Sequence, residues 1–238
     1  MRSRHFAALS LAAALLVTGT AATQSAAATV RAGDVQADPT DCPREQYRPT
    51  AEDKKKYYCG FKELGPKVLP ATVAKLLKNY DRFGGLTPQQ FLSWYRDGLD
   101  WKYPAQDGFR DVNGAIDRTT VEIPAGTKLD RFGAYYGRYL SKTGTSFPER
   151  ALPPDSLNPV VDDGPEVEAY HCYLVKKPLK VEQGAIASGF AQPGNGVQQY
   201  LNEKLKPAEL GSDSYTVKTL LDTKYGYLES RPAAECLA

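Results

Sequence analysis

Apolar residues recur at helical spacing in the segment from Val68 to Gly98. Val73, Leu76 and Leu77 fall at positions i, i+3 and i+4, which place them on one face of a helix. The spacing therefore predicts a first helix in this segment that packs against a core.

A second helix is predicted to begin at Thr87. Pro88 occupies the first helical position, Gln90 completes a capping box with Thr87, and Gly98 is expected to stop the helix. The aromatic side chains that follow at helical spacing are expected to pack in the core by ordinary burial preferences: Phe91, Trp94 and Tyr95.

The pattern changes to strand-like fragments after about residue 110. These fragments begin near Val121, and the aromatic and β-branched residues 170–175 predict a half-buried strand that Pro178 ends. Extension is expected to resume at residues 179–181. A short helix and a last strand are then predicted from the remaining apolar residues: Val217, Leu220, Leu221, Tyr227 and Leu228.

Strands with few helices between them predict an α+β fold. We expect a compact mixed catalytic domain with central β-structure over residues 111–238. A small helical N-terminal subdomain over residues 42–110 is expected to precede it.

The first residues carry the features of an export signal. Two arginines in residues 1–5 precede an uncharged apolar run that is too short to span a bilayer, and small residues near Ala26 supply a cleavage site. We therefore predict a signal peptide over residues 1–28 and a flexible leader over residues 29–41. No later segment is apolar enough to anchor the chain, so we expect a secreted protein that contacts no membrane after cleavage.

Charge argues against nucleic acid as a partner. Cleavage after residue 28 removes two of the 30 basic residues and none of the 28 acidic ones, leaving 28 of each. A protein that holds nucleic acid through its phosphates usually has a basic excess, so nucleic-acid binding is disfavoured.

The four cysteines are an even number in an exported chain, which favours two disulfides in one of three pairings. We favour Cys42 with Cys59 and Cys172 with Cys236. No C-x-x-C motif occurs, and His171 is the only histidine outside the signal peptide, so we expect no metal site built from cysteines or several histidines.

The common nucleophile motifs do not fit this chain. His171 and Cys172 are neighbours on a predicted strand and would point to opposite faces, so they cannot form a catalytic dyad. A serine nucleophile elbow, G-x-S-x-G, is absent from the sequence. The acidic residues between 162 and 168 are read as a solvated loop, with a calcium site as the less favoured alternative.

Two glycine-containing segments are candidates for ligand contact. In residues 130–133, an arginine and an aromatic residue stand side by side at a bend, where they could grip an anion and stack on a flat ring. Residues 194–196 lack the remainder of a dinucleotide-binding fingerprint and predict either a tight turn or a ligand-facing loop.

Read together, five motifs occur in a familiar order. They are the segment from Tyr103-Pro104 to Phe109, Leu129-Asp130-Arg131-Phe132-Gly133, Gly137-Arg138-Tyr139-Leu140-Ser141, Phe147-Pro148-Glu149-Arg150 with the prolines after it, and Gly194-Asn195-Gly196-Val197-Gln198. Over residues 100–232 the chain resembles the TNT family, named for the tuberculosis necrotizing toxin, which includes fungal surface NADases. No one motif would be specific; their order is.

The resemblance implies hydrolysis of NAD+ to nicotinamide and ADP-ribose, with NAD+ as substrate and no cofactor. It implies catalytic roles for Arg131 and Gln198 and substrate-binding roles for Phe132, Tyr139 and Arg150. The doubled glutamine leaves open whether Gln198 or Gln199 faces the substrate. The helical segment 42–110 is similar to an extra subdomain of the fungal enzymes and suggests a packing element or a possible homodimer.

Two other functions stay open at this point. An ADP-ribosyltransferase or cyclase would pass the same intermediate to another acceptor, although no catalytic glutamate motif is recognisable. A non-enzymatic secreted binding module would keep the motifs as a scaffold.

Overall fold

The computed structural model describes residues 42–43, 48–161 and 164–237. The predicted signal peptide and leader lie outside these residues. The described residues belong to one compact unit.

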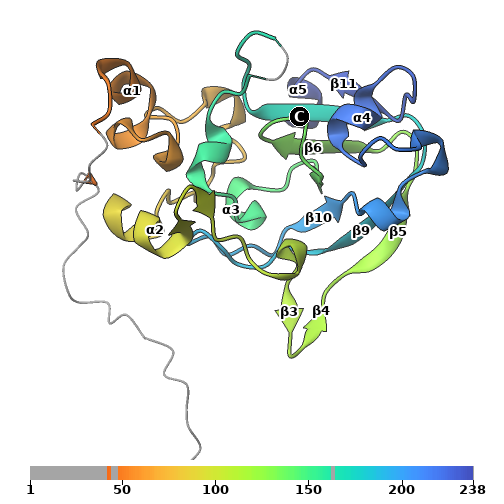
Figure 1. Cartoon of the computed structure of the whole chain (residues 1–238), viewed down its shortest axis with the longest axis horizontal. Helices are drawn as coiled ribbons and strands as arrows, with labels where there is room; N and C mark the ends of the chain where they lie inside the picture. The colour runs from red at the N-terminus through yellow and green to blue at the C-terminus, as the bar shows by residue number, and fades with distance from the viewer. Residues whose placement is uncertain (1–41, 44–47, 162–163, 238) are drawn as a thin grey trace, which may run out of the picture. The chain divides into compact units, whose positions relative to one another are not determined.

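A seven-stranded antiparallel sheet forms the centre of this unit (Figure 1). Its strand order is β11-β8-β6-β7-β10-β9-β5. The strands are β5 (Thr119–Ile123), β6 (Lys128–Phe132), β7 (Tyr139–Lys142), β8 (Tyr170–Val175), β9 (Leu179–Ala185), β10 (Val197–Tyr200) and β11 (Leu228–Arg231). The predicted α+β fold with central β-structure is confirmed.

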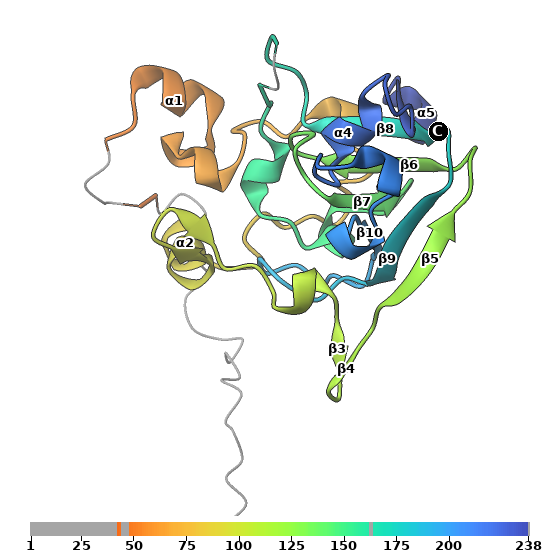
Figure 2. The same ribbon diagram turned by 45° about the vertical axis from the view of Figure 1, so that its right-hand side comes forward.

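The helices are short and lie around this sheet. They are α1 (Ala51–Lys56), α2 (Pro88–Tyr95), α3 (Phe147–Arg150), α4 (Val217–Leu221) and α5 (Ala234–Leu237). Two small hairpins, β1 (Arg96–Asp97) with β2 (Asp100–Trp101) and β3 (Asp111–Val112) with β4 (Ala115–Ile116), complete the regular structure. Figure 2 shows β3 and β4 projecting away from the sheet.

The predicted start of α2 is confirmed, and its predicted stop is wrong. Thr87 caps the helix, Pro88 follows it, and the capping box with Gln90 is complete. The helix ends at Tyr95 because the chain turns there into the β1–β2 hairpin, whose turn contains Gly98 with φ of 58°.

Only part of the predicted aromatic face of α2 is buried. Phe91 is fully buried, whereas Trp94 is 54% exposed, so the expectation of a core position is wrong for Trp94. The helix is two turns long, and its position toward Phe83 and Phe190 leaves Trp94 on the outer side of the cluster.

The helix predicted around Val73 is also wrong. A 3-10 helix covers Ala71–Val73 and is followed by turns, although Val73 and Leu76 are buried as expected. The segment is bounded by Pro70 and by Asn79, which has φ of 62°, and a stretch this short gains too few backbone hydrogen bonds to offset helix nucleation.

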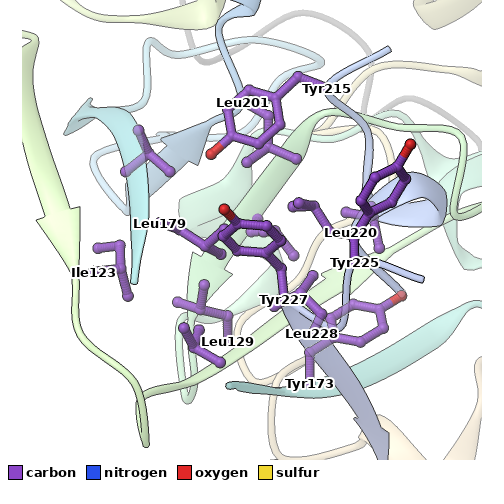
Figure 3. Packing of buried hydrophobic residues seen from close by; sticks show 14 of the residues in the cluster. Ile123, Leu129, Tyr173, Leu179, Leu201, Tyr215, Leu220, Tyr225, Tyr227 and Leu228 are labelled. Carbon is purple, nitrogen blue, oxygen red and sulfur yellow. The ribbon is translucent and has the colours of Figure 1, made fainter. Parts of the chain in front are cut away.

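One face of the sheet packs on the main hydrophobic core (Figure 3). Alternate residues of β6 and β8, such as Leu129 and Tyr173, point into this core together with Leu220 of α4 and Leu228 of β11. Side chains of the intervening residues, Asp130 among them, therefore lie on the other face.

Both predicted disulfides are present in the structure. Cys42 pairs with Cys59, and Cys172 pairs with Cys236 across 64 residues of sequence. The second bond ties α5 to β8. No helix among the described residues is long and apolar enough to cross a membrane.

The segment before β3 packs directly against the sheet domain. Phe83 and Phe91 form a cluster with Phe190, which follows β9, and the Gln192 side chain donates to the Asp81 carbonyl at 2.6 Å. An isolated bridge pairs Phe109 with the chain beyond β9. The boundary between residues 110 and 111 remains a prediction from sequence.

Candidate functional site

A cavity of about 660 Å³ lies over the face of the sheet formed by β6, β7 and β10. Its walls are completed by the loop at residues 103–108, by the residues that follow α3, and by Ile186 and Ala187 beyond β9. The volume lies within the range of roughly 300–1,000 Å³ that small-molecule sites usually have.

All five residues assigned to the site from sequence line this cavity: Arg131, Phe132, Tyr139, Arg150 and Gln198. They come from β6, β7, α3 and β10, which are neighbours in space although their sequence positions span 68 residues (Figures 1 and 2). Sheet pairing between β6, β7 and β10 is what brings them together.

Gln198 lies on β10 and is 6% exposed. Its Nε2 atom donates to the Asp107 carbonyl at 3.0 Å, which fixes the amide so that Oε1 is the atom left to accept a hydrogen bond. Gln199 points to the opposite face and donates to Gln183 Oε1 at 3.1 Å. Of the two glutamines, Gln198 lines the cavity.

The segment that holds Gln198 has an unusual backbone. Gln106, Asp107 and Gly108 have successive φ values of 58°, 56° and 77°, a conformation that is rare for residues other than glycine. This conformation turns the Asp107 carbonyl toward Gln198. The dipeptide Asp107-Gly108 is the sequence signal of this turn, and neither residue was predicted to take part in the site.

Arg150 is held almost entirely by the protein. Its Nη1 atom forms an ion pair with Asp130 Oδ1 at 2.7 Å, and its Nε and Nη2 atoms donate to the Thr145 carbonyl at 3.0 and 2.8 Å. The guanidinium also lies 5.1 Å from the centre of the Phe132 ring. Arg150 is therefore placed to shape the cavity wall, with three of its five N–H groups directed at Asp130 and Thr145.

Asp130 has a second partner, Tyr170, at its other carboxylate oxygen. Tyr170 donates to Asp130 Oδ2 at 2.8 Å, and burial together with this carboxylate raises the pKa of the Tyr170 hydroxyl above its usual range. Asp130 and Arg150 are both buried, so the pair holds α3 against β6 inside the protein.

Arg131 reaches the cavity from the opposite face of the sheet. Because side chains alternate along β6, the Arg131 side chain leaves the strand on the face opposite to that of Phe132. Its Nε atom donates to the Gly133 carbonyl at 3.3 Å and its Nη1 atom to the Tyr139 carbonyl at 3.1 Å. A Cβ atom at Gly137 would collide with the guanidinium, so glycine is required there for this packing.

The two aromatic residues of the site differ in exposure. Phe132 is buried, with its ring edge-on to Phe147 at 5.0 Å. Tyr139 is 43% exposed and stacks on Tyr200 at 4.9 Å, and desolvation raises the pKa of Tyr139 to about 12. Tyr103, which sequence analysis left without a role, is a further exposed aromatic residue on the cavity wall.

The alternatives to this site find no support in the described residues. Cys172 is bonded to Cys236, so it cannot serve as a nucleophile beside His171. His171 does not line this cavity; it lies in a separate hollow of about 820 Å³ with Tyr135 and Tyr173. Within the described part of the chain, no group of three or more His, Cys, Asp or Glu residues could hold a metal ion, and Asp162 and Asp163 lie outside that part.

Gly194 and Asn195 form the tight turn that leads into β10. Their φ values are 67° and 71°. Gly196 passes so close to Glu149 that a Cβ atom would lie 2.7 Å from the Glu149 carbonyl oxygen. Neither Gly194 nor Gly196 lines the cavity. Of the two predictions for residues 194–196, a tight turn or a ligand-facing loop, the structure therefore supports the tight turn.

The chain is similar to a known protein family and to a curated fungal protein. Residues 122–229 match the family model described as tuberculosis necrotizing toxin. The conidial surface nicotinamide adenine dinucleotide glycohydrolase nadA of Aspergillus fumigatus is 41% identical over 149 residues, which are 60% of this chain and 63% of nadA. The match thus spans less than two thirds of the length of that relative.

A solved structure of tuberculosis necrotizing toxin, complexed with its immunity factor, aligns at 21% identity with a TM-score of 0.40. The alignment covers 82% of this chain and 88% of the toxin chain.

Proposed function

We propose that this chain, which carries a tuberculosis necrotizing toxin domain over residues 122–229, is a secreted NAD+ glycohydrolase that releases nicotinamide and ADP-ribose. The observation that carries the proposal is the convergence of Arg131, Phe132, Tyr139, Arg150 and Gln198 on one cavity. The 41% identity to a relative named for this activity supports it.

The chemistry agrees with the residue types in the cavity. Nicotinamide leaves the cationic pyridinium of NAD+ as a neutral molecule, so no general acid has to protonate it. The protein must hold the substrate in position and stabilise an oxocarbenium-like state. Neither a carboxylate pair nor a cofactor is needed for this reaction, and we propose that NAD+ is bound as substrate only.

The proposed roles follow from the hydrogen bonds of each side chain. Gln198, fixed by the Asp107 carbonyl, offers Oε1 as an acceptor for a ribose hydroxyl or the attacking water. Arg131 supplies positive charge toward the diphosphate from the cavity wall. Arg150, neutralised by Asp130, positions Phe132 for contact with the nicotinamide ring.

Export is part of the proposal. The two disulfides are typical of chains that mature outside the cytoplasm, and the named relative is a surface protein. The possible homodimer has no support in the comparisons and stays a prediction.

Nicotinamide release from NAD+ by the purified mature chain tests the proposal directly. We expect release with ADP-ribose as the second product. Transfer of ADP-ribose to protein, or a cyclic product, would be detected by mass and would replace hydrolysis with one of the rival activities. Binding of NAD+ by calorimetry without any release at micromolar protein would favour a non-enzymatic binding module.

A further inference from the structure

Three polar side chains form a row on the face of the sheet that carries the cavity, and two of them, Ser141 and Gln198, line it. Asp130, Ser141 and Gln198 are paired in register across β6, β7 and β10, so their side chains point to the same face. Their exposed fractions are 0%, 6% and 6%. Ser141 is the middle member of the row and has no role in the function derived so far.

The neighbours of Ser141 in this row already have defined partners. Asp130 Oδ1 forms the ion pair with Arg150, and Asp130 Oδ2 accepts the hydrogen bond from Tyr170. The Gln198 amide nitrogen is taken by the Asp107 carbonyl. The Ser141 hydroxyl lines the cavity and has no hydrogen-bond partner among the residues that the structure describes. A nearly buried polar group of this kind is stabilised when a ligand supplies the partner.

We infer that Ser141 and Gln198 together bind the hydroxyl groups of the nicotinamide ribose. Gln198 Oε1 can only accept a hydrogen bond, and the Ser141 hydroxyl can donate or accept, so the pair suits a ligand group that itself donates. A ribose diol meets this requirement, because each hydroxyl both donates and accepts.

The charge at this point of the floor argues against the diphosphate as the ligand group. Gln198 presents an oxygen acceptor, and the Asp130 carboxylate next in the row is neutralised by Arg150, which leaves no net positive charge for an anion. The carboxamide of nicotinamide also carries a donor, and the experiment distinguishes it from the ribose.

The inference rests on the proposed NAD+ glycohydrolase activity, and Ser141→Ala tests it in the full mature chain with its disulfides. We expect kcat/KM for nicotinamide release from NAD+ to fall about tenfold, the usual effect of losing one neutral hydrogen bond in a transition state. Ser93→Ala is the matched control, because Ser93 is an exposed serine of α2 whose hydroxyl donates to the Gln90 carbonyl.

Substrate analogues separate binding from a structural effect. With NAD+ analogues that lack the 2′- or the 3′-hydroxyl of the nicotinamide ribose, the difference between wild type and Ser141→Ala should shrink to less than about twofold for at least one analogue. An equal loss with NAD+ and both deoxy analogues would overturn the inference. A loss that disappears only with the 3-acetylpyridine analogue would assign the pair to the carboxamide and overturn the ribose assignment.

Failure of the proposed function is distinguishable from failure of this inference. If the wild type releases no nicotinamide, the same comparison is made by calorimetric binding of NAD+ and its deoxy analogues. Weaker binding by Ser141→Ala that depends on the ribose hydroxyl would support the inference without the activity. Unchanged binding, or no binding by the wild type, would overturn it.

Discussion

Two adjacent glutamines on β10 occupy opposite environments. Gln198 faces the cavity and is oriented by the strained Asp107 turn, whereas Gln199 is buried on the other face and bonds to Gln183. The doubled glutamine could not be resolved from sequence, because the face of each residue depends on the register of β10 with β7 and β9.

Alanine at each position should separate activity from stability. Gln198→Ala is expected to lower kcat for nicotinamide release by roughly two orders of magnitude, because it removes a positioned polar group from the cavity, and to lower Tm no more than Gln199→Ala, because each variant loses one partly buried amide hydrogen bond. Gln199→Ala should lower Tm and leave kcat within about threefold, because it breaks a hydrogen bond buried away from the cavity. Steady-state kinetics and thermal unfolding of both variants make the test, and the opposite pattern would assign the site to Gln199.

Which residues form the site could be predicted from sequence, but the contacts that hold them could not. The order of five motifs placed Arg131, Phe132 and Gln198 in one site, and the structure brings them to one cavity. The partner of Arg150 was not predictable, because Asp130 lies 20 residues away and meets Arg150 only through the packing of α3 on β6. Ser141 ends one of the five motifs, but it was given no role, because a serine in a strand does not show by its sequence position which face it occupies.

At the scale of elements, the contact between α3 and β6 depends on one buried ion pair. Arg150 and Asp130 lie 2.7 Å apart with side chains 3% and 0% exposed. Arg138 and Glu203 lie at the same 2.7 Å, but their side chains are about one third exposed. These two ion pairs therefore have the same N–O distance and differ mainly in the burial of their side chains.

Removal of each arginine should give very different stability changes. Arg150→Ala leaves the Asp130 carboxylate buried without its countercharge, and we expect the free energy of unfolding to fall by about 3–5 kcal/mol. Arg138→Ala removes a solvated pair and should cost less than about 1 kcal/mol. Urea denaturation of the two variants at pH 7 measures both, and equal losses would contradict the structural role given to Arg150.

Elements with strong local signals were predicted well, and those set by tertiary packing were not. The start of α2 was predictable because its capping box is local in sequence, and β8 was predictable from its apolar and β-branched residues. The segment around Val73 has helical spacing, yet its apolar side chains pack from a 3-10 helix and turns instead. Periodicity over one turn could not distinguish these conformations.

At the scale of the whole described unit, a half-buried carboxylate links the segment before β3 to the sheet domain. Trp101 of β2 donates from Nε1 to Asp155 Oδ2 at 2.9 Å, and Asp155 lies in the 3-10 helix that follows α3. Burial raises the pKa of Asp155 to about 6; the Trp101 hydrogen bond and the positive charges of Arg96 and Lys62 lower it, and Glu63 raises it further.

This raised pKa predicts how stability changes with pH. An aspartate in the unfolded chain titrates near pH 4, so between about pH 4 and 6 the folded state binds more protons and wild-type stability falls as pH rises. Asp155→Asn keeps an acceptor for Trp101 without the charge. The variant should match the wild type near pH 4 and exceed it by roughly 2–3 kcal/mol above about pH 6. Urea denaturation from pH 4 to 8 measures the difference, with Asp97→Asn on the exposed β1–β2 hairpin as the matched control. If the difference in free energy of unfolding between wild type and Asp155→Asn stays constant from pH 4 to 8, Asp155 is not the source of the pH dependence.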